Sequence, residues 1–80
     1  MTADEARDAI MRHLERMDRA ECIFVFNKGS YLGNSVVMEI GYAYAQRKPV
    51  YVLAPIHDPF LMPLLSAVVS LEELIHLVHP

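Results

Sequence analysis

The chain has a single cysteine, few basic residues and no long apolar run, and each shortage excludes a class of protein. Cys22 cannot form an intramolecular disulfide, so we expect a buried thiol in a cytoplasmic protein. No apolar run approaches the roughly 18 residues of a membrane span, so no membrane partner is expected. The N-terminal residues lack the basic-then-apolar pattern of a signal peptide. Seven basic against ten acidic residues give a net charge of −3, which argues against nucleic acid as a partner.

The size and the apolar content of the chain point to a subunit interface. Eighty residues form one small domain, 1–80, which buries only roughly 60–65% of its unfolded surface when it folds alone. The hydrophobic fraction of 54% is nevertheless above the usual globular level. We therefore expect a homo-oligomer, a dimer or larger.

The first half of the chain predicts a helix followed by a strand–helix–strand unit. Residues 2–19 are typical of a helix, because Thr2 and Glu5 form a capping box and apolar residues recur at helical spacing. The apolar runs at 22–26 and 50–54 are typical of strands buried on both faces of a parallel sheet. Between them lies a helix, capped by Asn34 or Ser35 and ended near residue 47 by the proline at 49. Residues 22–54 thus predict a right-handed βαβ unit.

The second half predicts weaker elements. Residues 55–63 are irregular with at most a short helical turn near Leu61, and 67–69 predict a brief third strand. Ser70 and Glu73 form a second capping box, which opens a helix through about Val78. Its inward face consists of Leu71, Leu74, Ile75 and Val78. An apolar cluster is expected to pack against a second subunit: Phe60, Leu61, Met62, Leu64 and Leu65. The whole order predicts an α/β fold of three layers with two or three strands.

Chemistry concentrates where the first strand leads through a glycine-containing loop into the central helix. This arrangement places backbone N–H groups and the positive end of a helix dipole beside a ligand. Glu39 lies just past the first turn of that helix. It is either a nucleophile that attacks a sugar C1′ or a surface glutamate stabilised by the same dipole.

Other polar residues around this loop also have two interpretations each. Gly33, Asn34 and Ser35 form either an anion-binding turn or an ordinary helix cap. Asn27 either orients a base or ribose, or bonds its own turn. Tyr31 either stacks on a base or packs the loop.

His13, on the first helix, is either a general acid that protonates a departing base or a partly buried structural histidine. The remaining histidines are too dispersed for a metal site, so neither a metal nor a cofactor is expected.

These residues resemble the nucleoside 2-deoxyribosyltransferase family, which includes the deoxynucleoside monophosphate N-glycosidases. The matching segments are Ala20-Glu21, Gly33-Asn34-Ser35, Glu39-Ile40-Gly41-Tyr42-Ala43 and Arg47-Lys48-Pro49. One branch of the family is also similar at His13, Asn27, Gly29, Tyr31, Leu32, Gly33 and Ser35.

The resemblance implies a flavodoxin-like or Rossmann-like sandwich that acts on a small nucleoside or nucleotide. It implies that Glu39 is the nucleophile, with His13 as an auxiliary catalytic residue. It also implies that 33–35 bind phosphate or sugar, together with the substrate-binding residues Asn27, Gly29 and Tyr31. Compared with the family, the chain begins after the usual first βα unit. This difference favours an alternative: a catalytically inactive nucleotide-binding or oligomerisation module of the same fold.

Overall fold

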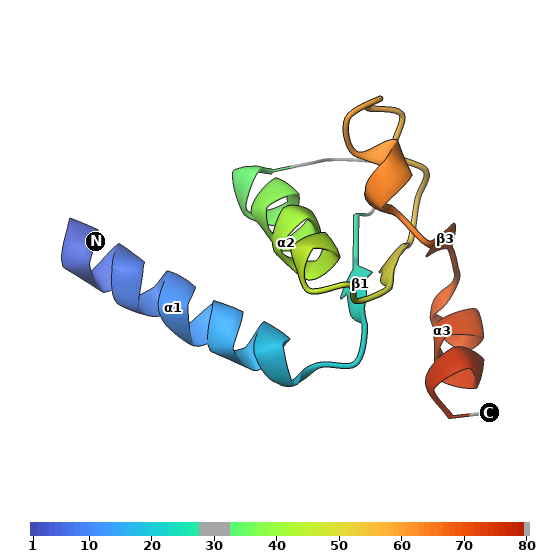
Figure 1. The fold of residues 1–80 in the computed structure, drawn as a ribbon, viewed down its shortest axis with the longest axis horizontal. Coiled ribbons are helices and arrows are strands. Elements are labelled where there is room, and N and C mark those ends of the chain that lie inside the picture. Colours follow the sequence, from blue (N-terminus) through green and yellow to red (C-terminus); the bar gives the residue numbers. More distant parts are fainter. Residues whose placement is uncertain (28–32, 80) are drawn as a thin grey trace.

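The chain folds as a parallel α/β unit. A computed structural model describes residues 1–27 and 33–79. Its elements are α1 (Ala3–Arg19), β1 (Ile23–Val25), α2 (Asn34–Ala45), β2 (Val50–Val52), η2 (Met62–Leu64), β3 (Ala67–Val68) and α3 (Leu71–Val78). The three strands form one open sheet in the order β1-β2-β3, with both neighbouring pairs parallel (Figure 1). The predicted fold class and the βαβ unit are therefore confirmed.

The sheet buries one face against α2. In register, Val25 lies opposite Val52, and Val52 opposite Val68. The buried core consists of Met17, Val25, Ile40, Ala43, Val50, Val52, Ile56 and Leu61. The β1–β2 ladder ends at Val25 and Val52, so both strands are shorter than the apolar runs that predicted them. An apolar run shows which residues can be buried in a sheet, whereas the length of a strand depends on how many of its residues pair with the neighbouring strand.

α1 begins as the sequence predicts. The Thr2 side chain accepts from the Glu5 backbone, and the Glu5 side chain accepts from the Thr2 backbone. Acidic residues in the first turn and arginines in the last complement the helix dipole. No helix within 1–27 and 33–79 is both long and apolar enough to cross a membrane.

α2 begins and ends differently from the prediction. Gly33 is its N-cap, and no side chain caps the helix, so the expected cap by Asn34 or Ser35 is wrong. The helix ends at Ala45 rather than near 47, because Arg47 adopts a left-handed φ of 60°. The N–H of Arg47 then bonds the Tyr44 carbonyl, and that of Lys48 bonds the Ala43 carbonyl. This is a Schellman turn with arginine at the position that glycine usually occupies.

The segment before β3 divides its apolar residues between core and surface. Leu61 is buried, and Leu64 and Leu65 pack partly against the core. Phe60 and Met62 are exposed by 87% and 51%. The predicted apolar cluster thus packs mainly within its own chain.

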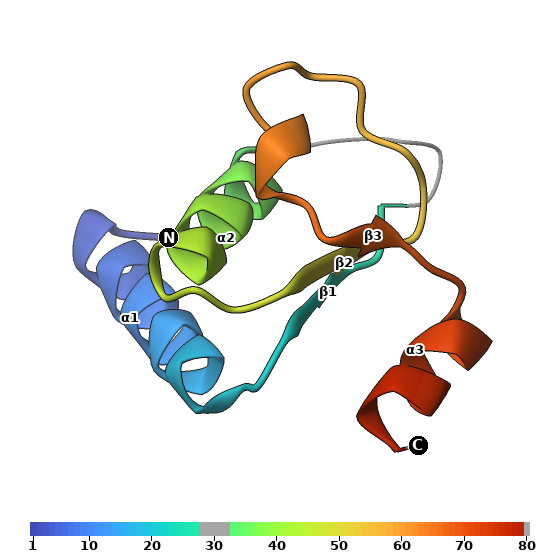
Figure 2. The same cartoon turned by 45° about the vertical axis from the view of Figure 1, so that its right-hand side comes forward.

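The helices lie on both sides of the sheet. Figure 2 shows α1 and α2 on one side and α3 on the other, beyond β3. α3 has the predicted capping box of Ser70 and Glu73. Its apolar stripe does not face inward as expected, because Leu71, Ile75 and Val78 are 50%, 56% and 42% exposed.

Candidate functional site

The fold brings together the two candidate catalytic residues of the sequence, His13 and Glu39. Glu39 lies in the second turn of α2, and His13 lies in the middle of α1, 26 residues earlier. The His13 Nε2 atom is 2.9 Å from Glu39 Oε1. The two side chains are 38% and 24% exposed, respectively, so the pair is partly shielded from solvent.

Arg16 contacts the other ring nitrogen of His13, with its Nη2 atom 3.4 Å from Nδ1. A carboxylate accepts and a guanidinium donates, so both contacts fit a His13 tautomer with its proton on Nε2. In that tautomer His13 donates to Glu39 Oε1. Within 1–27 and 33–79, no group is hydrogen-bonded to the other carboxylate oxygen, Oε2.

A polar contact near the end of α1 sets how α1 lies on α2. The Asp18 carboxylate accepts from the Tyr42 hydroxyl at 2.6 Å and from Gln46 Nε2 at 2.5 Å. The Tyr42 bond lowers the pKa of the Asp18 carboxyl, with a smaller contribution from Gln46. The same bond raises the pKa of the Tyr42 hydroxyl.

Lys48 strengthens this contact from the other side of the helix end. Its Nζ donates to the Met17 and Asp18 carbonyls in the last turn of α1 at 2.5 and 2.8 Å. The Met17 carbonyl also accepts from the Ala20 N–H. Sequence reasoning missed this contact. Asp18 is one of several acidic residues interleaved with arginines on α1, and nothing in the pattern singles it out.

The start of α2 lies one turn from Glu39. The Gly33 carbonyl accepts from the N–H groups of Val36 and Val37. The N–H groups of Asn34 and Ser35 have no acceptor within the described residues, as expected for the first turn of a helix. Both side chains are exposed. Ser35 precedes Glu39 by four residues, so the two share one side of α2.

Asn27 has a structural position. It is only 3% exposed. Its Oδ1 accepts from the Leu53 and Ala54 N–H groups at 3.0 Å each, and its Nδ2 donates to the Ala54 carbonyl at 2.8 Å. The side chain thus joins the carboxyl ends of β1 and β2. The other two predicted binding residues, Gly29 and Tyr31, lie outside the described residues.

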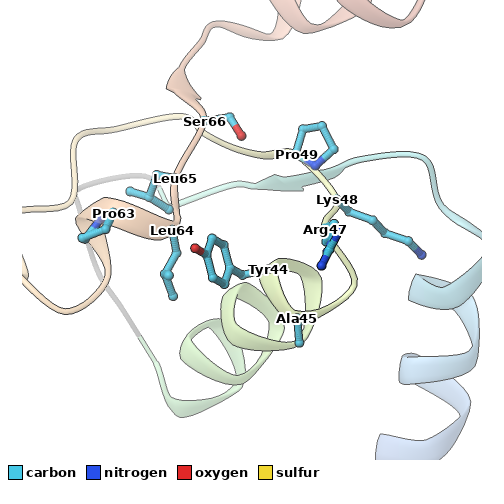
Figure 3. A pocket seen from close by; sticks show the side chains of 9 residues that line it. All are labelled: Tyr44, Ala45, Arg47, Lys48, Pro49, Pro63, Leu64, Leu65 and Ser66. Atoms are coloured by element: carbon cyan, nitrogen blue, oxygen red, sulfur yellow. The ribbon is translucent and has the colours of Figure 1, made fainter.

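A hollow of about 640 Å³ lies at the opposite end of α2. Figure 3 shows the Tyr44 ring in it, between the helix and the 63–66 segment. The Lys48 side chain extends away from it toward α1 (Figure 3). None of the predicted site residues lines this hollow. In the described part of the chain, no group of three His, Cys, Asp or Glu side chains is placed to hold a metal ion.

Comparison with known proteins adds no further constraint: no protein-family model, no curated protein and no solved structure matches this chain.

Proposed function

We propose that the protein acts on the N-glycosidic bond of a nucleoside or nucleotide, as an N-glycosidase or 2-deoxyribosyltransferase-like enzyme. The observation that carries the proposal is the 2.9 Å contact between His13 and Glu39. The resemblance of residues 33–45 to the family motif supports it. A cytoplasmic location belongs to the same proposal, because the free thiol of Cys22 stays reduced there.

Glu39 has the chemistry of a nucleophile in this proposal. Its free Oε2 attacks C1′ of the sugar, and the C1′–N bond breaks with its electron pair going to the base nitrogen. Water then attacks C1′ and releases the carboxylate. The base gains one proton and water loses one, so the net reaction is hydrolysis of the N-glycosidic bond. When a second base attacks C1′ in place of water, the sugar is transferred to that base.

His13 holds the carboxylate rather than protonating the base. Its Nε2 proton is already donated to Glu39 Oε1, and this bond fixes the carboxylate plane while Oε2 points to the substrate. The free N–H groups of Asn34 and Ser35 suit a 5′-phosphate or a sugar hydroxyl, because they lie at the positive end of α2.

The test is release of free base from deoxynucleosides and their 5′-monophosphates, followed by chromatography. We expect Glu39→Ala to lower the rate by at least about a thousandfold, as removal of a nucleophile does. Glu15→Gln is the matched control, because it removes an exposed carboxylate from α1 near His13. Equal release by wild type and Glu39→Ala would remove Glu39 from the mechanism.

The alternative is a nucleotide-binding or oligomerisation module without turnover. The position of the His13–Glu39 pair favours it, because the pair bridges α1 and α2 as a purely structural contact would. Thermal denaturation with and without nucleotides separates the two functions. Stabilisation without base release supports a binding module, and no shift with any nucleotide supports a structural one.

A further inference from the structure

α3 is a helix that its own chain leaves uncovered. It has eight residues, and none of them is buried. Isolated helices shorter than about 12 residues are marginal in water, so the capping box alone does not account for its stability. Some apolar surface must cover this helix.

Both sides of α3 are exposed, and one of them is apolar. Leu71, Leu74, Ile75 and Val78 recur at helical spacing and form one stripe. Leu74 alone is half-buried, while the other three are 42–56% exposed. Val68 on the edge strand β3, which precedes α3, is also 50% exposed.

The total exposed surface is too large for a compact monomer. The chain exposes 5833 Å², whereas a folded monomer of 9.1 kDa exposes about 4,900 Å². The excess of about 900 Å² belongs to the whole chain and is close to the roughly 800 Å² that each partner contributes to a standard interface. Among the described residues, four of the thirteen exposed large apolar side chains lie on α3: Leu71, Ile75, Leu77 and Val78. The radius of gyration of 13.2 Å, against about 11.6 Å for a compact domain of this length, agrees.

We propose that α3 and β3 form the interface of a symmetric dimer of this chain, in which the apolar stripe of one α3 packs against α3 and Val68 of the second copy. The charges of α3 suit self-pairing. Glu72, Glu73 and His76 lie on the opposite side of the helix from the stripe, so pairing stripe to stripe keeps the carboxylates in solvent. A two-fold axis pairs a patch with the same patch on the second copy. The stripe carries no charge, so this pairing brings no like charges together.

This interface is independent of the proposed chemistry, because no residue of the His13–Glu39 site lies on α3. It also differs from the sequence expectation, which placed the interface at 60–65. In the structure, Leu61, Leu64 and Leu65 already pack against their own core.

The test is the solution mass of the full chain at micromolar concentration, from size-exclusion chromatography with light scattering. We expect twice the chain mass for the wild type and one chain mass for Ile75→Glu, which puts a carboxylate into the stripe. His76→Glu is the matched control: it adds the same carboxylate one residue later, on the polar side, and should remain dimeric. A wild-type monomer, or an Ile75→Glu protein that stays dimeric, would overturn the proposal.

A second measurement needs no variant. Amide hydrogen exchange of residues 71–78 should slow as the wild-type concentration rises through the dimerisation range, because α3 is covered only in the dimer. Exchange in α3 that does not depend on concentration would equally overturn the proposal.

Discussion

Asn27 shows how a single polar side chain can connect two strands. The strands β1 and β2 pair over only three residues each, and a bond from the Leu53 N–H to the Val25 carbonyl follows directly. Asn27 adds to this backbone bond, since its amide serves two N–H groups and one carbonyl beyond β2. The sequence predicts a bond to its own turn or to a ligand. The actual partners, Leu53 and Ala54, are distant in sequence and emerge only from the pairing of the strands.

Removing this side chain should destabilise the fold. We expect Asn27→Ala to lower the free energy of unfolding by about 2 kcal/mol, because the N–H and the carbonyl of Ala54 lose their partner. The Leu53 N–H keeps its bond to the Val25 carbonyl. Urea denaturation measures the change. The control is Asn34→Ala on the exposed first turn of α2, which should shift stability by no more than about 0.5 kcal/mol. Equal effects of the two substitutions would contradict this role.

His13 and Glu39 show what residue patterns can and cannot predict. Each was a candidate from its own surroundings: Glu39 from its place near a helix start, and His13 from its place at the edge of an apolar stripe. Their 2.9 Å contact depends on how α1 crosses α2. Asp18, Tyr42 and Lys48 also connect α1 to α2 and to the residues after it, and their roles have no local signal in the sequence.

At the scale of elements, helix starts with a capping box were predictable, while the boundaries of α2 were not. Thr2 and Ser70 each have a glutamate three residues later, and both boxes form. α2 has the cap-forming residues Asn34 and Ser35, yet Gly33 takes the N-cap position. The end of α2 could not be predicted either, because the residue that adopts the left-handed conformation is Arg47 and not a glycine.

Glycine at position 47 should therefore stabilise the chain. A non-glycine residue at a φ of 60° is strained, so we expect Arg47→Gly to raise the free energy of unfolding by about 0.5 to 1 kcal/mol. Ala45→Gly is the matched control two residues earlier. It lies at a helical φ and should lower stability by about 0.5 kcal/mol. A loss of stability with Arg47→Gly in urea denaturation would show that the turn does not strain the backbone.

The composition of the chain predicts more apolar surface than one copy buries when it folds. A hydrophobic fraction of 54% in 80 residues indicates apolar surface left over after folding. Among the described residues, four of the thirteen exposed large apolar side chains lie on α3, whose stripe the sequence assigned to the interior. Periodicity identifies an apolar face of a helix, but it does not say whether the same chain or another covers that face.

Attack of Glu39 on the anomeric carbon would leave a covalent adduct, which intact-mass spectrometry detects directly. The protein is incubated with a 2′-deoxy-2′-fluoroarabinosyl nucleotide, whose fluorine slows hydrolysis of a glycosyl ester. We expect the chain mass to rise by that of the fluorosugar phosphate, with the adduct on the peptide that contains Glu39 and none on Glu39→Gln. Base release without an adduct on Glu39, or an adduct on another residue, would contradict the account.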